Sequence, residues 1–173
     1  AWRIVGETGL GPVETTGIHY AHFASKLFGQ CTKSSILVNC LTGKRAAVDT
    51  GILNMETDTG VWVRIRHSYA APYAVRLEVW GTEGYFVYND PVARLYHPRD
   101  SFDADGLYAT PPIKESWEMK FKKVWADSLI KAQLDFVESA AEKRSFDPAE
   151  FDRDLTVMNC LLDADINRCT NEA

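Results

Sequence analysis

Residues 61–89, VWVRIRHSYAAPYAVRLEVWGTEGYFVYN, decide the fold class of this 173-residue chain. Hydrophobic and polar side chains alternate within 61–68 and 74–80, and a period of two is typical of β-strands with one buried face. A third strand is predicted at 85–89, and the short breaks at 59–60 and 82–84 favour hairpins. Two more strand-like segments precede this block, at 34–40 and 52–58, so the neighbouring strands are predicted to run antiparallel.

The two faces of this predicted sheet differ in composition. One carries aliphatic side chains and is predicted to face the core: Val61, Val63, Ile65, Val75, Leu77 and Val79. The other mixes tryptophan with charged residues: Trp62, Arg64, Arg66, Arg76, Glu78 and Trp80. We interpret this mixed face as a surface for a partner. The alternative is that long arginine side chains cover the tryptophan rings within a monomer.

Helices are predicted on both sides of the strands. Residues 18–29 have helical spacing of apolar side chains, and Gly29 is a natural stop. After a Pro- and Asp-rich stretch at 90–112, one helix is predicted over 117–144 and another from Asp147-Pro148 through Cys169. Residues 1–17 are glycine-rich and predicted to be irregular. The order of elements predicts an α+β fold, a large, mainly antiparallel open sheet with helices packed on one face.

Composition excludes several classes of protein. The 46% hydrophobic content excludes an intrinsically disordered chain, and no apolar run is long enough to cross a bilayer. A net charge of −5 with only paired basic residues argues against nucleic-acid binding. The four cysteines form no CxxC motif and are predicted to be buried, reduced thiols of a cytoplasmic protein: Cys31, Cys40, Cys160 and Cys169.

No cofactor or metal site is predicted in the chain. Gly6, Gly9 and Gly11 have the wrong order for a dinucleotide-binding fingerprint, and no phosphate-binding loop motif occurs. His19 and His22 can face the same side of one helix, but no further ligands are evident for a metal. Histidines that hydrogen-bond backbone carbonyls near a helix start are the structural alternative.

The opening segment nevertheless carries a recognisable order of motifs. They are residues 2–3 (WR), 9–13 (GLGPV), 17–20 (GIHY) and 27–29 (LFG), followed later by 77–87 (LEVWGTEGYFV). This order resembles the C-terminal domain of the glucose–fructose oxidoreductase/inositol dehydrogenase/MocA (Gfo/Idh/MocA) family, and the two closing helices fit its ending. The resemblance spans nearly the whole chain.

The resemblance implies a division of labour with another part of a longer protein. In that family an N-terminal Rossmann domain binds NAD or NADP and supplies a lysine from an E-K-P motif, and this sequence has neither. Residues 1–173 are therefore expected to be a single substrate-binding and oligomerisation domain, a piece of a longer or processed chain and inactive in isolation. The implied substrate is a small sugar, polyol or related hydroxy compound, and the implied partner is a second copy, bound through the open sheet face. A non-catalytic ligand-binding or assembly domain with this fold is the alternative.

The resemblance also implies a site. The family's catalytic histidine falls on His19, which would exchange a proton with the substrate hydroxyl while hydride moves to or from nicotinamide. Thr15, Tyr20 and His22 are the implied substrate-binding residues. Two departures are evident, because Thr15 and His22 each replace a family aspartate. Glu14 is next to the first of these positions, but is expected to point elsewhere.

Overall fold

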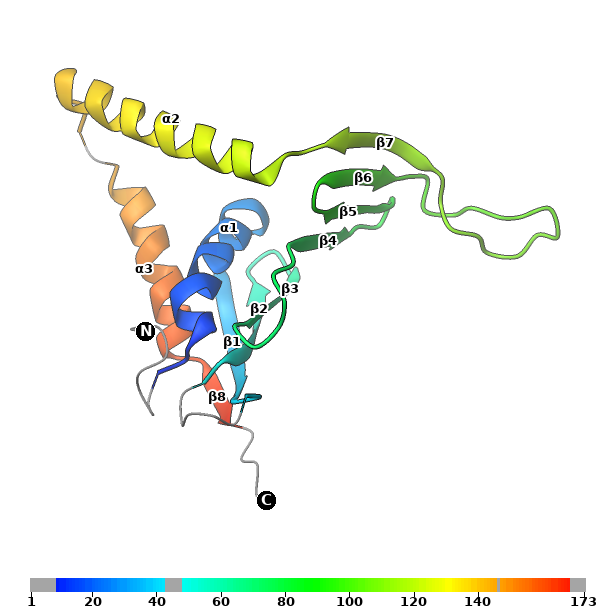
Figure 1. Ribbon diagram of the computed structural model, residues 1–173, viewed down its shortest axis with the longest axis horizontal. Coiled ribbons are helices and arrows are strands. Elements are labelled where there is room, and N and C mark those ends of the chain that lie inside the picture. The colour runs from blue at the N-terminus through cyan, green and yellow to red at the C-terminus, as the bar shows by residue number, and fades with distance from the viewer. Residues whose placement is uncertain (1–8, 43–47, 146, 169–173) are drawn as a thin grey trace. The chain divides into compact units, whose positions relative to one another are not determined.

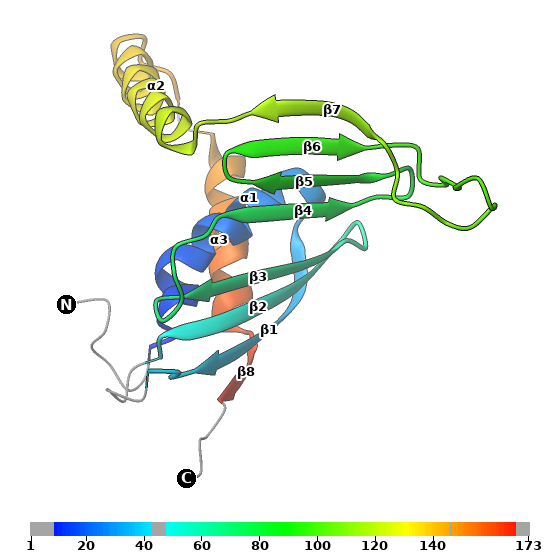
Figure 2. The ribbon, with the colours of Figure 1, turned by 45° about the vertical axis from the view of Figure 1, so that its right-hand side comes forward.

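The computed structural model describes residues 9–42, 48–145 and 147–168. Contacts divide this part of the chain into two compact units: the first contains the described residues up to Pro72 and those from Asp147 onward, and the second is Tyr73–Ser145. Each unit contains a four-stranded sheet (Figures 1 and 2). The α+β class is confirmed, with the strands divided between two sheets rather than joined in one. That residues 1–173 form a single domain stays a prediction.

The sheet of the first unit has the strand order β3-β2-β1-β8. β1 (Cys31–Asn39), β2 (Thr50–Thr57) and β3 (Trp62–Ser68) form the predicted antiparallel run. β8 (Asp165–Arg168) pairs in parallel with β1, so that Ile166 lies opposite Ile36. The predicted helix through Cys169 is therefore wrong beyond Leu162, since the edge of β1 supplies hydrogen bonds to the backbone there. Cys169 itself lies outside the described residues.

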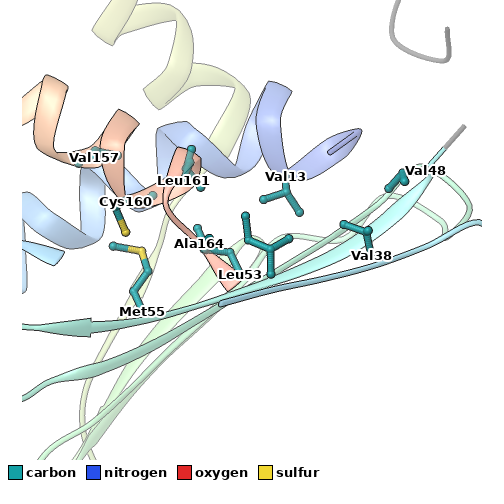
Figure 3. Close-up of a cluster of buried hydrophobic side chains, with 11 residues drawn as sticks. Val13, Val38, Val48, Leu53, Met55, Val157, Cys160, Leu161 and Ala164 are labelled. Atoms are coloured by element: carbon teal, nitrogen blue, oxygen red, sulfur yellow. The ribbon is translucent and has the colours of Figure 1, made fainter. Parts of the chain in front are cut away.

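Two helices cover one face of this sheet. α1 (Ile18–Phe28) and α3 (Pro148–Leu162) contact each other, and both contact strands of the sheet. The Asp147 side chain accepts a hydrogen bond of 2.9 Å from Ala149 N, the predicted start of α3. Between helices and sheet lies one apolar core (Figure 3), formed by Val13, Ala21, Ile36, Val38, Val48, Leu53, Met55, Val157, Cys160, Leu161 and Ala164. Val63 and Ile65 pack against it, which confirms the predicted core face of β3.

The second unit contains an antiparallel sheet and a long helix. β4 (Arg76–Trp80), β5 (Tyr85–Asn89), β6 (Val92–Tyr96) and β7 (Ile113–Glu118) are neighbours in this order, visible in Figure 2, and α2 (Phe121–Ala141) follows. β6 and most of β7 fall in stretches for which the sequence predicts no strand, and residues 117–118 end β7 rather than begin a helix. Pro91 lies in the turn between β5 and β6, where it removes no ladder hydrogen bond.

The prediction of reduced thiols is wrong for Cys31 and Cys160, whereas Cys40 takes part in no disulfide with the described residues. Cys31 at the start of β1 and Cys160 in the last turn of α3 form a disulfide, with Cα atoms 6.3 Å apart. The fold brings the two residues within the range that a disulfide spans, although 129 positions separate them in sequence. Among the helices of the described ranges, none has the length and apolar character of a membrane span.

Leu53→Ala tests the core of the first unit. Leu53 is fully buried, so we expect the truncated side chain to lower the free energy of unfolding by about 2–5 kcal/mol. Urea denaturation followed by circular dichroism measures this change. The matched control is Leu37→Ala, because Leu37 on β1 is 39% exposed and should cost much less. Equal losses in the two variants would contradict the assignment of Leu53 to the core.

Candidate functional site

The segment that leads into α1 is a π-helical turn, η2 (Val13–Gly17). Gly11 precedes it with a φ of 57°, and a Cβ atom on Gly11 would lie 2.3 Å from the carbonyl oxygen of Val48. Only glycine tolerates both this backbone conformation and this close approach. The Glu14 carboxylate accepts a hydrogen bond of 3.2 Å from Leu10 N, so it is engaged in the preceding turn.

Thr15 on η2 is hydrogen-bonded to Tyr69, which follows the end of β3. The Thr15 hydroxyl donates its proton to the carbonyl oxygen of Gly11 over 3.1 Å. Its oxygen is also in hydrogen-bond contact with the Tyr69 hydroxyl. A threonine hydroxyl has one proton, so the Tyr69 phenol is the donor in the second hydrogen bond. The result is a directed chain from Tyr69 through Thr15 to the backbone.

A second network holds the backbone of Tyr69. Tyr69 N donates to the carbonyl oxygen of Asp49 over 2.7 Å. Thr50 Oγ1 lies 3.0 Å from Asp49 Oδ1 and 2.7 Å from Ser68 Oγ. The Thr50 hydroxyl donates its hydrogen bond to the Asp49 carboxylate, so the Ser68 hydroxyl is the donor in its hydrogen bond with Thr50. Side-chain and backbone hydrogen bonds therefore fix Tyr69 at both ends.

The Asp49 carboxylate anchors this second network. Burial alone would raise its pKa, but hydrogen bonds from Leu41 N, Thr42 N, the Thr42 hydroxyl and the Thr50 hydroxyl outweigh that effect and lower the pKa from 3.8 to about 2. The backbone donors of Leu41 and Thr42 are both 2.9 Å from the carboxylate. The group is therefore ionised at neutral pH, although it is only 7% exposed.

Tyr20 on α1 contacts the imidazole of His67 on β3. The two ring centroids are 5.1 Å apart, with a tilt of 45° between the ring planes. His67 lies opposite Gly51 in the β2–β3 ladder, and a Cβ atom placed on Gly17 would be 3.6 Å from its Cδ2 atom. Burial lowers the pKa of the His67 imidazole from 6.5, and this favours the neutral ring near pH 7.

The two histidines of α1 have different surroundings. The His19 side chain is exposed, and it has no hydrogen-bond or ion-pair partner among the residues that the structure describes. His22 Nδ1 lies 2.7 Å from Asp154 Oδ1 of α3, so His22 links the two helices. The structure therefore brings Thr15 and Tyr20 against the end of β3, whereas His22 contacts α3. No group of three potential metal ligands occurs in the described ranges.

His67 and Tyr69 are absent from the site inferred from the sequence. Their signal is the strand period: residues 63, 65, 67 and 69 continue the core-facing series, and the last two are polar-capable side chains on an otherwise aliphatic face. A polar residue at such a position requires a partner. The sequence could have indicated both residues, but it could not identify η2 and α1 as the elements that cover them.

Comparison with known proteins identifies relatives by family and by fold. The family model described as the GFO/IDH/MocA C-terminal domain matches residues 1–87. No curated protein sequence matches the chain.

Among solved structures, the fold is similar to a putative NADPH-dependent oxidoreductase from Desulfitobacterium hafniense, with a TM-score of 0.66, 13% identity and coverage of 95% of this chain and 48% of that one. A 3-ketoreductase from Actinomadura kijaniata, in complex with TDP-benzene and NADP, has a TM-score of 0.65 and 13% identity. The match covers 91% of this chain and 49% of that one. An oxidoreductase from Agrobacterium radiobacter, in complex with NAD+, L-tartaric acid and magnesium, has a TM-score of 0.62 and 14% identity. The match covers 88% of this chain and 45% of that one. The chain thus spans about half the length of these proteins.

The carboxylate of Asp49 predicts a defined acid sensitivity. Its pKa is lower in the folded state than in the unfolded state, so its contribution to stability is present above pH 3.8 and is lost as the pH falls from 3.8 to about 2. Asp49→Asn should therefore lower the free energy of unfolding by about 1–3 kcal/mol at pH 6, and the difference from the unsubstituted protein should shrink below pH 3.8.

Chemical denaturation at a series of pH values measures the effect. Asp58→Asn is the control, since Asp58 is an exposed aspartate of the same unit. A difference between Asp49→Asn and the unsubstituted protein that stays constant down to pH 2 would contradict the role given to the ionised carboxylate.

Proposed function

Because the chain belongs to the GFO/IDH/MocA family, whose C-terminal domain it carries, we propose that it is the substrate-binding half of an NAD(P)-dependent oxidoreductase. The proposed substrate is a sugar, polyol or related hydroxy compound. The observation that carries the proposal is the exposed imidazole of His19, next in sequence to Tyr20, which packs on His67. Two proteins of similar fold contain NADP or NAD+ in their crystals, which supports the proposed cofactor class.

The described residues of this chain do not fit a nicotinamide dinucleotide. Such a cofactor is held by a glycine-rich turn between a strand and a helix, with its phosphates at the helix N-terminus. Here α1 follows a π-helical turn whose first residues include the acidic Glu14, which disfavours a phosphate. We therefore assign cofactor binding to another part of the full-length protein and derive no step through the cofactor.

His19 is the proposed proton-transfer residue. An imidazole is the side chain best suited to exchange a proton with an alcohol near neutral pH. Thr15 and Tyr20 are proposed to line the substrate site beside it. His22 keeps its place as a proposed substrate contact, in addition to its contact with the Asp154 carboxylate.

A second candidate function is a non-catalytic ligand-binding or assembly domain. Thr15 favours it, because a threonine replaces the family's aspartate and its proton is already donated to Gly11. No carboxylate at position 15 can then orient or charge the catalytic imidazole. A loss of turnover on substitution of His19 separates the two candidates.

Self-association through the mixed sheet faces is also proposed. The Trp62 side chain is 84% exposed and that of Trp80 is 74% exposed, so the arginine side chains do not cover these rings. On the second sheet, Trp80 stacks on Tyr85, and Tyr85 stacks on Tyr96, with centroid distances of 4.9 and 4.4 Å. Trp80 is exposed and the two tyrosines are half-buried, and a row of aromatic rings that ends at an exposed tryptophan is a favourable surface for a second copy.

His19→Asn in the full-length oxidoreductase should lower kcat by about 10²–10⁴-fold. Asparagine keeps some hydrogen bonding but cannot exchange the proton, so cofactor affinity should barely change. Turnover with a screened panel of sugars and polyols measures the effect, and His97→Asn, an exposed histidine of the second unit, is the control. Near-normal turnover in His19→Asn would favour the assembly domain.

Trp80→Glu tests the proposed contact between copies. A carboxylate in a desolvated interface is costly, so sedimentation velocity at micromolar concentration should show a shift from dimer or larger species to monomer. Tyr73→Glu is the control, because Tyr73 is 76% exposed but lies outside the strands. A chain that sediments as a monomer without substitution would remove the support for this contact.

A further inference from the structure

The end of β3 and the residue directly after it form one wall of the site. His67 and Tyr69 are two positions apart and so face the same side of the strand direction. Each is tied to the segment that carries His19: Tyr69 to Thr15 by a hydrogen bond, and His67 to Tyr20 by a ring contact. Residues from η2, α1 and β3 therefore meet at one place within the first unit.

The Tyr69 hydroxyl group can still accept a hydrogen bond from a ligand. Its phenol proton is directed to Thr15, whose own proton is donated to Gly11. The remaining capacity of the Tyr69 oxygen is as an acceptor. Tyr69 is 39% exposed, so a ligand that brings a hydroxyl proton can reach it.

His67 complements this acceptor. A neutral imidazole has one nitrogen that accepts a hydrogen bond and one that donates. The ring is half-buried between Tyr20 and the backbone at Gly17, and burial lowers its pKa, so the neutral form is the one present near pH 7. The Tyr20 ring beside it is 42% exposed and offers an apolar surface.

We propose that His67 and Tyr69 form a pair that binds two neighbouring hydroxyl groups of a neutral polyhydroxy substrate, and so determine its specificity. The proposal rests on the substrate-binding role proposed above and adds the residues and charge class that this role uses. Tyr69 Oη and one ring nitrogen of His67 each accept a hydrogen bond from a substrate hydroxyl. The carbon chain of the substrate packs on the ring of Tyr20.

The charges around the pair favour a neutral substrate. Carboxylates and phosphates bring acceptors rather than donors, and when they leave water they require several hydrogen-bond donors or a cation. Among residues 9–42 and 48–72, the partners given for the pair are Thr15, Gly17, Tyr20, Gly51 and Asp49, and none of these carries a positive charge. Neither the Tyr69 oxygen nor the neutral imidazole compensates a negative charge.

A matched pair of small molecules tests the proposal on the chain itself. L-threitol and L-tartrate have the same vicinal diol and differ in their ends, which are hydroxymethyl groups in one and carboxylates in the other. With the histidine side chains labelled with ¹³C, we expect L-threitol to shift the His67 resonance in a saturable way and L-tartrate to leave it unchanged. His97 belongs to the second unit and serves as the internal reference.

Tyr69→Phe should weaken L-threitol binding about tenfold, the equivalent of one hydrogen bond. Tyr73→Phe, at an exposed tyrosine outside the cluster, should leave binding unchanged. Thr15→Val is the second variant. It removes the acceptor that orients the Tyr69 proton, so it should reduce the preference for L-threitol over L-tartrate. Circular dichroism spectra establish that each variant is folded.

Several results would overturn the proposal. They are a His67 resonance that does not respond to L-threitol, an equal response to L-tartrate, and undiminished binding by folded Tyr69→Phe. A response of His19 without one of His67 would also overturn it, while leaving the proposed substrate-binding role intact. Turnover by the full-length oxidoreductase and its loss in His19→Asn decide that role independently.

Discussion

The pairing of β1 with β8 is the constraint on which the first unit depends. It joins residues 35–38 to residues 165–168 in parallel, so two segments that are far apart in sequence must meet before the sheet is complete. α3 comes immediately before β8 and is thereby placed beside α1 and over the apolar core. α1 in turn carries His19 and Tyr20, and η2 carries Thr15. The geometry of the candidate site therefore depends on a strand of four residues far away in sequence.

Donors and acceptors at the site are arranged in one direction. The chain from Tyr69 through Thr15 ends on a backbone carbonyl, and the chain from Ser68 through Thr50 ends on the Asp49 carboxylate. The Ser68 oxygen also accepts hydrogen bonds from Ala70 N and Ala71 N, whereas the Tyr69 oxygen keeps acceptor capacity. Where the family has an aspartate, this protein has a threonine that orients a tyrosine. In the proposed site, a neutral pair thus stands at the position where the resemblance implies a charged group.

Sequence reasoning predicted what local patterns determine. Alternation of apolar and polar residues gave β3, β4 and β5, and the Asp147-Pro148 cap gave the start of α3. Sequence reasoning failed where pairing with a distant segment determines the structure. Ile166 fits the apolar stripe of a helix as well as a strand, and only its pairing with β1 distinguishes the two. β6 was missed since proline and aspartate in 90–112 indicate a loop locally, and β7 was missed because its last two residues, 117–118, were assigned to the helix that follows. At the site, the motif indicated His19 and Thr15, and the strand period could have indicated His67 and Tyr69, but only the structure identifies η2 and α1 as the elements in contact with these two residues.

The disulfide between Cys31 and Cys160 gives the chain a further property. It closes a covalent ring between two residues that are 129 positions apart in sequence, and the whole second unit, Tyr73–Ser145, lies inside that ring. The backbone joins the second unit to the first at both of its ends, and the disulfide joins the two segments of the first unit to each other. A protease that cuts it once opens the ring but releases no fragment, because the two pieces remain joined through the sulfur atoms. Separation of the two pieces therefore requires a reductant in addition to the protease.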